Sequence, residues 1–315
     1  MRARRAFCVS SDGGCCAAVE RALEAAGLEV THTSTVDPLA EAALIVVDRA
    51  ARQAAGDALR TLGAPVVVGD DLDDDSLIAL MLESSISHLV TDPRDRDLGI
   101  TSEKLASGDL FGLEKYVAAG TEVGERLVLG DDVMGPSAPR LRAAMDEVCA
   151  FAEAAGARKP TLHRIANVVD ELLMNALREV PTSGERRAVL RWAADERAVV
   201  ISVADDLGSL RQRDVIAHVR RARADKGRPQ PSAPAKIADA TPPAGIDVST
   251  GERRKPSGGA GLGLYLVLAN VAALVVNVAP GKRTEIVCVF DLSRGMRPSV
   301  TGVRALHVFS DSVAR

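Results

Sequence analysis

Glu171 and Asn175 stand four residues apart in the segment RIANVVDELLMNALREV, which spans 164–180. Its apolar residues recur at helical spacing: Ile165, Val168, Val169, Leu172, Leu173 and Ala176. The segment therefore predicts an amphipathic helix, with Glu171 and Asn175 projecting together from its polar side. A carboxylate can orient or deprotonate water, and an amide oxygen can ligate Mg²⁺. The pair is a candidate site for a metal-bound triphosphate, although such pairs are commonly solvated helix surface.

A second candidate is the glycine-rich run GGAGLGLYLV, which begins at Gly258 and leads into an apolar helix. Glycines let the backbone approach a ligand, and free N–H groups at a helix N-terminus attract phosphate. The run lacks the G-K-[ST] ending of a Walker loop and the context of a dinucleotide fingerprint. Its candidate nucleotide contacts are Gly259, Gly261, Leu262 and Gly263.

The third candidate is the end of an apolar strand, in VISVADDLGSL. A buried carboxylate at a strand end can accept a hydrogen bond from the exocyclic amino group of adenine, and Gly208 would leave room for the ring. Asp205 and Asp206 are both candidates, and we favour Asp205 because V-x-D fits the strand end. The alternative is an ordinary acidic turn.

The order of these motifs, followed by GKRTE at 281–285, resembles the ATP-binding domain of the gyrase/Hsp90/histidine-kinase/MutL class over residues 141–294. The resemblance implies that Glu171 is the acidic residue of the asparagine box and Asn175 the Mg²⁺ ligand. It also implies that Asp205 reads the adenine, that Gly259, Gly261 and Gly263 are lid glycines, and that Thr284 lies near the base. Members of the class usually have Asp-x-Gly, and the register here is either Asp205 with a displaced Gly208 or Asp206-Leu207-Gly208.

The elements needed to position these residues follow from the pattern. We expect helices at 140–155 and 161–180, and strands at 187–193, 198–205, 273–279, 284–291 and 304–309. A further helix is expected near 211–222. Residues 226–257 are rich in Pro, Ala, Lys and Arg without apolar periodicity, and we interpret them as a flexible lid.

The first hundred residues alternate short apolar runs with helical segments. We expect strands at 6–10, 28–35, 43–48, 64–70 and 87–92, and helices at 14–26, 49–62 and 73–84. This alternation predicts a doubly wound parallel sheet.

Residues 5–97 resemble a bacterial response-regulator receiver domain, with Asp48 in the phosphoacceptor position. Three features depart from that pattern. Only Asp12 follows the first strand, Gly69 or Asp70 replaces a hydroxyl residue, and Asp92 replaces a lysine. Because these changes weaken the stabilisation of a transferring phosphoryl group, we interpret the domain as a pseudo-receiver that docks partners.

The predicted fold class is α/β, with a receiver-like domain at 1–98, a connector at 99–140 and a two-layer histidine-kinase-like ATPase domain at 141–315 of the Bergerat type. The connector is expected to hold a helix at 110–119 and a strand at 125–129. Two domains suit a chain of 315 residues.

Composition narrows the function classes. The net charge of −4 gives no general attraction for nucleic acid or an anionic membrane. The five cysteines show neither a C-x-x-C pair nor a metal-ligand spacing with histidine, so we interpret them as reduced thiols. No apolar run reaches the length of a signal core or a membrane span. We therefore expect a cytoplasmic protein, and the resemblance to a bacterial receiver domain implies a bacterial one.

None of the five histidines lies in the setting of a phosphoacceptor: His32, His88, His163, His218 and His307. The sequence thus favours a signalling protein that binds ATP and Mg²⁺ and uses them to gate binding of an unidentified protein partner, with a homodimer left open. The alternative is a serine kinase similar to anti-sigma-factor kinases, in which Glu171 activates the hydroxyl of a partner. Whether the chain is an enzyme stays open at this point.

Overall fold

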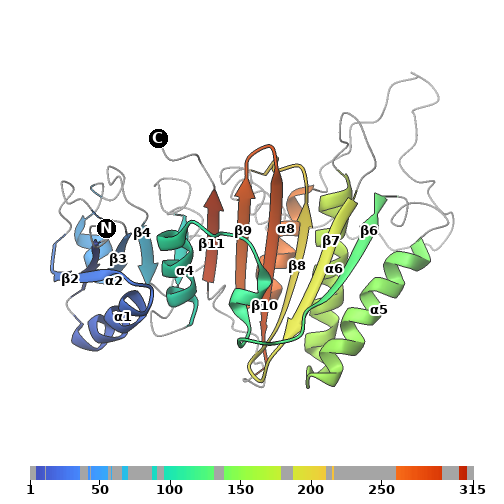
Figure 1. Cartoon of the computed structure of the whole chain (residues 1–315), viewed down its shortest axis with the longest axis horizontal. Coiled ribbons are helices and arrows are strands. Elements are labelled where there is room, and N and C mark those ends of the chain that lie inside the picture. Colours follow the sequence, from blue (N-terminus) through green and yellow to red (C-terminus); the bar gives the residue numbers. More distant parts are fainter. Residues whose placement is uncertain are drawn as a thin grey trace, which may run out of the picture.

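In the described part of the structure, a computed structural model of the chain, the strands form one eleven-stranded sheet (Figure 1). The strand order is β2-β1-β3-β4-β5-β11-β9-β10-β8-β7-β6. The residues that the structure describes are 5–10, 12–35, 42, 44–55, 58, 66–69, 87–90, 96–130, 138–178, 187–210, 215, 260–292 and 305–310. The expected helix at 73–84, the lid at 226–257 and most of the helix expected at 211–222 lie outside these ranges, as do Asp70 and Asp92.

The N-terminal part of the sheet is parallel. Its strands are β1 (Arg5–Val9), β2 (Glu29–Thr33), β3 (Leu44–Asp48), β4 (Val66–Gly69) and β5 (His88–Val90). Their order, β2-β1-β3-β4-β5, is one of the doubly wound orders. The helices described in this part are α1 (Gly13–Ala25), α2 (Arg49–Ala55) and α4 (Arg96–Ser107). Each of the five expected strands is present, and the predicted α/β class is confirmed.

The other part of the sheet is antiparallel from β9 to β6. Its strands are β6 (Gly124–Leu129), β7 (Arg187–Ala194), β8 (Ala198–Asp205), β9 (Ala273–Ala279) and β10 (Arg283–Asp291). Its helices are α5 (Ala138–Ala154), α6 (Lys159–Arg178) and α8 (Ala260–Asn270). The strands expected at 198–205 and 273–279 agree residue for residue. Among the described helices, none combines the length and the hydrophobicity needed to cross a bilayer.

Strand β11 (Ala305–Ser310) joins the two parts of the sheet. It pairs antiparallel with β5 and parallel with β9, so it lies between them in the sheet. Figure 1 shows it beside β9. A strand near 304–309 is expected from the sequence, but its place in the middle of the sheet is not. The division into a pseudo-receiver and an ATPase domain stays a prediction.

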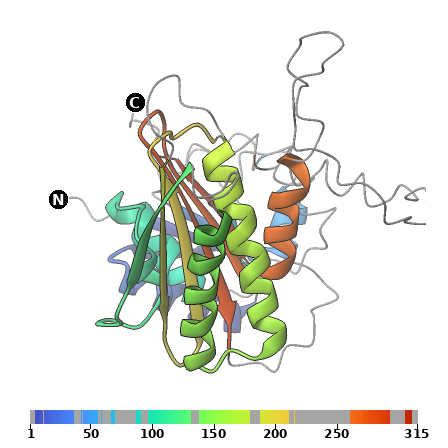
Figure 2. The ribbon, with the colours of Figure 1, turned by 90° about the vertical axis from the view of Figure 1, so that its right-hand side faces the viewer.

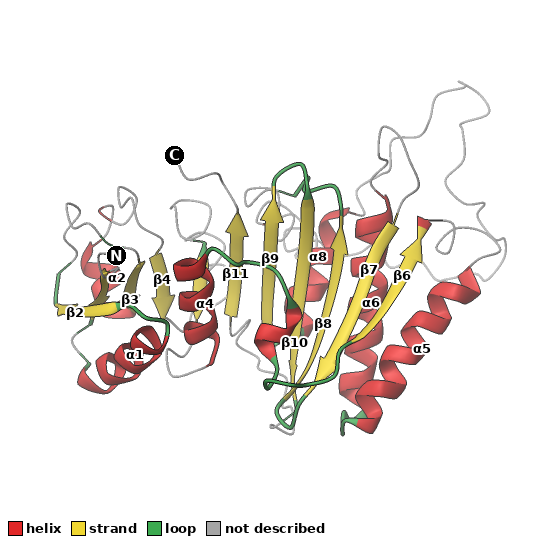
Figure 3. Ribbon diagram, in the orientation of Figure 1, coloured by secondary structure: helices red, strands yellow, loops and turns green. Residues whose placement is uncertain are grey.

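Side chains alternate between two buried layers along the strands, as the pleat requires. Helices α2, α5, α6 and α8 contribute to the main core, together with Ile45, Ile201 and Leu274 from three strands. The opposite face is covered by α1 and α4 at one end, and by α4 and the 3₁₀ helix η2 (Leu113–Tyr116) farther along. Figures 2 and 3 show α5, α6 and α8 gathered on one side of the sheet.

The connector is where local pattern and structure differ. The helix expected at 110–119 is wrong, because only η2 forms there. Gly112, with φ of 105°, precedes it, and its N–H donates to the buried carboxylate of Glu285 at 2.9 Å. Conversely, α4 is not expected from the sequence because it buries Thr101, Ser102 and Lys104, which interrupt its apolar pattern.

Candidate functional site

The candidate residues lie at the ends of four elements that meet at one edge of the sheet: the end of α6, the end of β8, the start of β10 and the start of α8. Strand β10 runs antiparallel to β8, so the start of β10 lies beside the end of β8. Helix α8 leads within three residues into β9, which is also antiparallel to β10, so the first turn of α8 lies toward that same edge. The end of α6 precedes β7, whose Ala188 pairs with Asp205. Figure 2 shows α6 and α8 side by side on the sheet.

Asp205 and Thr284 are direct partners across the β8–β10 pair. Their strands alternate so that both residues follow the face covered by α6 and α8, where Val203 and Phe290 belong to the main core. Asp205 Oδ1 accepts hydrogen bonds from the N–H groups of Leu207 at 2.8 Å and Gly208 at 3.4 Å. Its carboxylate is thus held at the strand end by the turn that follows.

The hydroxyl group of Thr284 is a buried polar atom. The residue is 3% exposed, and its Oγ1 has no hydrogen-bond partner among the residues that the structure describes. A buried hydroxyl without a partner is costly, and a ligand that hydrogen-bonds to it removes that cost. This observation fits the role of a nucleotide-contacting threonine.

The second acid of the pair lies in a different environment. Asp206 is 61% exposed on its side chain, and its Oδ2 lies 2.6 Å from Nη2 of Arg187 on β7. Asp205, in contrast, is half-buried beside the buried Thr284. The environment of the two carboxylates therefore favours Asp205 as the candidate for reading a base.

The backbone conformation and the packing of the adjacent turn both favour glycine at position 208. It adopts φ of 56°, and a Cβ built on it would overlap the carbonyl oxygen of Ala279 and the amides of Gly281 and Lys282. The Gly281 N–H also donates to the Gly208 carbonyl at 3.1 Å. The β9–β10 turn thus fills the space on the Cβ side of Gly208, and the contact of Gly208 with an adenine ring stays a prediction.

Helix α6 carries the expected core face. Ile165, Val168, Val169, Leu172 and Leu173 are all buried, and Ala176 packs against the same core. Along the polar stripe, Asn167 is exposed, whereas Glu171 and Asn175 are half-buried. The two candidate residues therefore lie where the helix approaches its neighbours. Leu264, Val267 and Leu268 of α8 belong to the same core.

The glycine run is described in part. Helix α8 begins at Ala260, so Gly261, Leu262 and Gly263 form its first turn, while Gly259 lies outside the described residues. The N–H groups of a first helical turn have no partner within the helix and point outward along its axis. Together with the Glu171 carboxylate, the Asn175 amide and the Thr284 hydroxyl, this end of α8 supplies donor and acceptor types that suit Mg-ATP.

Asp48, at the position expected for a phosphoacceptor, and Asp12 are both engaged in helix capping. Asp48 Oδ1 accepts from the Ala51 N–H at 2.7 Å in the first turn of α2, and its other oxygen accepts from the hydroxyl of Ser10. Asp12 Oδ1 accepts from the Gly14 N–H at 2.8 Å and is the N-cap of α1. N-capping is a common structural role for aspartate.

A buried polar network on the opposite face of the sheet is not expected from the sequence. Lys104 Nζ donates to Asn277 Oδ1 at 2.7 Å and to the hydroxyl of Tyr116 at 3.0 Å. Asn277 Nδ2 donates to Glu285 Oε2 at 3.1 Å. Burial lowers the pKa of Lys104 to about 7, against the opposing effect of Glu285. Polar residues within the apolar strands β9 and β10 are the signal that could have indicated it.

Two histidines lie beside this network. The ring of His88 on β5 packs 4.5 Å from Phe309 and 5.6 Å from His307 on β11, measured between centroids. Burial, reinforced by the charge of Lys104, lowers the pKa of His88 to about 3. The pKa of His307 is also lowered, mainly by burial. Both rings are therefore neutral at physiological pH.

Comparison of the sequence with protein-family models found no match, and comparison with curated proteins found none either.

Proposed function

We propose that this chain binds Mg-ATP in a histidine-kinase-like ATP-binding unit, at the sheet edge where α6, β8, β10 and α8 meet. Asn175 would ligate Mg²⁺, and Glu171 would act on the attacking or bridging water. Asp205 and Thr284 would contact the base, and the first turn of α8 would receive the phosphates. The nucleotide in turn controls the binding of a signalling partner.

One observation carries this proposal. The ends of four elements meet at one sheet edge and bring together residues that are far apart in sequence. These residues have the side-chain types that a metal–nucleotide complex needs. The pairing of the half-buried Asp205 with Thr284, whose hydroxyl lacks a partner in the described part of the chain, supports a polar ligand at this edge.

We assign partner binding, and not phosphotransfer, to the N-terminal unit because its acidic residues Asp12 and Asp48 have structural roles. Asp12 and Asp48 cap helices α1 and α2, which is a structural use of both carboxylates. A docking unit on a receiver-like fold requires no phosphotransfer. Because β11 hydrogen-bonds to both β5 and β9, a change at the nucleotide edge has a continuous sheet through which to reach this unit.

Isothermal titration of the full-length protein with Mg-ATP tests the binding. Asn175→Ala and Asp205→Asn should each weaken binding by about 10–100-fold, which corresponds to the loss of one interaction with a charged group. Asp206→Asn is the matched control, since Asp206 is exposed and paired with Arg187. The proposal would be overturned if wild-type protein gave no binding heat with Mg-ATP and if Mg-ATP and a fluorescent ATP analogue did not compete for it.

Amide hydrogen exchange tests the control of partner binding separately. Saturating Mg-ATP should change protection in β5 and β11 as well as around α6 and α8. Changes restricted to the nucleotide edge would contradict nucleotide control of the N-terminal unit while leaving ATP binding intact.

A second candidate function is protein kinase activity, favoured by the half-buried carboxylate of Glu171 on the same stripe as Asn175. In this reaction Glu171 accepts the proton of a serine or threonine hydroxyl, whose oxygen attacks the γ-phosphorus as ADP leaves. Incubation with γ-labelled ATP and candidate partner proteins should then label the partner, and Glu171→Ala should abolish the label. No labelled partner, or labelling that survives Glu171→Ala, would exclude this function.

A further inference from the structure

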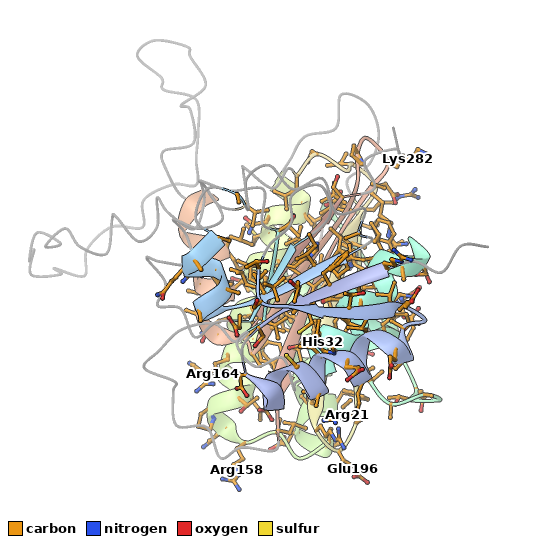
Figure 4. The ribbon with its side chains drawn as sticks, turned by 90° about the vertical axis from the view of Figure 1, so that its left-hand side faces the viewer. Arg21, His32, Arg158, Arg164, Glu196 and Lys282 are labelled. Carbon is orange, nitrogen blue, oxygen red and sulfur yellow. The ribbon has the colours of Figure 1, made fainter. Side chains whose placement is uncertain are left out.

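Three metal-ligating side chains lie together at the opposite end of the sheet, far from the nucleotide edge in sequence. Cys8 is on β1, Cys16 on α1 and His32 on β2, and their ligand atoms all lie within 4.8 Å of one another. The register explains the meeting of two of them, because Cys8 and His32 are direct partners in the parallel β1–β2 pair. Figure 4 faces the β2 edge and shows His32 beside α1.

The spacing of the sulfur atoms matches that of a shared metal ion. Cys8 Sγ and Cys16 Sγ are 3.9 Å apart. A tetrahedral zinc ion with Zn–S bonds of about 2.3 Å holds two sulfurs about 3.8 Å apart, and a nitrogen at about 2.0 Å lies about 3.6 Å from each sulfur. A disulfide requires about 2.05 Å between the sulfurs, and these two cysteines form none.

The surroundings suit a bound cation. Cys8 is 1% exposed, Cys16 is half-buried, and His32 is exposed at the edge, so the ligands run from the interior to a solvent-accessible entry. Glu20 Oε2 on α1 lies 3.5 Å from His32 Nε2. A carboxylate there can orient the imidazole ring or complete four-coordination.

We propose that Cys8, Cys16 and His32 form a zinc site that clips α1 to the edge strand β2, with Glu20 or water in the fourth position. Two thiolates and an imidazole select a soft or borderline ion such as Zn²⁺ over Mg²⁺ or Ca²⁺. On binding, the two thiols release their protons to solvent as two Zn–S bonds form, with no change in oxidation state. The site is independent of the proposed ATP binding.

Zinc binding at this site would stabilise strand β2 locally. Strand β2 is the outer strand of the sheet at this end, and none of its residues is buried. A mostly exposed edge strand has few apolar contacts of its own to hold it. A metal ion bound by His32, Cys8 and Cys16 would attach β2 to strand β1 and to helix α1.

Titration of the reduced, chelator-treated full-length protein with Co²⁺ and then Zn²⁺ tests the site. We expect one equivalent of Co²⁺ to bind with a thiolate-to-metal charge-transfer band and tetrahedral d–d bands, and Zn²⁺ to displace it. Zn²⁺ should also raise the melting temperature. Cys16→Ser and His32→Gln should lose more than the roughly 10–100-fold in affinity that an outer-shell partner contributes.

Matched variants assign the ligands. Cys15→Ser replaces the cysteine that precedes Cys16 in the sequence, and Cys149→Ser removes a half-buried thiol in α5. Both variants should keep the full spectrum and affinity. Circular dichroism of the metal-free variants separates loss of a ligand from loss of fold, which matters most for the buried Cys8. Glu20→Gln should lower affinity whether Glu20 orients His32 or binds the metal.

Three results would overturn the site. The first is no charge-transfer band in reduced, folded wild type. The second is a Cys8–Cys16 disulfide in protein prepared with zinc. The third is loss of binding in Cys15→Ser with retention in Cys16→Ser.

Discussion

Asp205 and Thr284 face each other across the antiparallel β8–β10 pair, one at the end of its strand and the other at the beginning. They are 79 positions apart in sequence, and the intervening chain includes helix α8. Their meeting places an acceptor carboxylate beside a buried hydroxyl group at the edge where α6 ends and α8 begins.

Thr284→Val should change the stability and the ATP affinity in opposite directions. Valine has nearly the same shape but removes a buried hydroxyl that has no partner within the described residues. The free energy of unfolding without nucleotide should therefore rise by about 1 kcal/mol, whereas the Mg-ATP affinity should fall by about tenfold. Urea denaturation and calorimetry measure the two quantities. A drop in both would contradict a ligand-facing hydroxyl.

Asn175→Ala should abolish the Mg²⁺ dependence of nucleotide binding with little effect on the fold, because the side chain is half-buried on the polar stripe of α6. Asn167→Ala, two turns earlier on the same stripe and exposed, is the control. Titrations with ATP in Mg²⁺ and in EDTA measure the difference. Equal effects of the two substitutions would indicate that Asn175 is ordinary helix surface.

Gly208→Ala should destabilise the protein by about 3 kcal/mol or more, because the substitution combines positive φ with overlap against the β9–β10 turn. Gly281→Ala is the matched control. Gly281 has φ of 69°, but its Cβ would meet no atom within 4 Å in the described part of the protein, so only about 1–2 kcal/mol is expected. Chemical denaturation of both variants compares them. Equal losses would mean that the turn moves away freely.

Acid should destabilise the protein through His88. Because the pKa of His88 is lowered from 6.5 to about 3 in the folded state, the unfolded chain binds a proton first as pH falls. The stability from the neutral ring is therefore complete above pH 6.5 and is lost between pH 6.5 and about 3.

His88→Leu removes this titration. The slope of unfolding free energy against pH should decrease by up to about 1.4 kcal/mol per pH unit in that window. Urea denaturation at several pH values measures both slopes. Identical slopes in wild type and variant would contradict a buried neutral ring.

Strands and one helix of the site could be predicted because their signals are local. β8 and β9 are mostly apolar runs, each with one polar residue inside it, Ser202 and Asn277. The core face of α6 repeats at helical spacing from Ile165 to Leu173. The meeting of Asp205 with Thr284 brings together two residues expected from the motifs. The roles of Glu171, Asn175 and the α8 glycines stay predictions.

The parts that could not be predicted depend on contacts that are distant in sequence. Helix α4 buries Lys104 because Asn277, 173 positions away, accepts its hydrogen bond. The apolar residues around η2 resemble a helix until Gly112 turns the backbone toward Glu285. Likewise, no spacing along the chain shows that Cys8 and His32 are strand partners.

The position of β11 also determines when, during synthesis of the chain, the sheet can be completed. β5 ends at Val90, and the strand that covers its open edge begins about 215 residues later in the chain. At about 5–20 residues per second, a ribosome needs about 10–40 s to supply it. During that interval the parallel strands have an unpaired border beside β5, so pairing with another nascent chain competes with the arrival of β11. The completed sheet closes that border when β11 hydrogen-bonds to β5 on one side and β9 on the other.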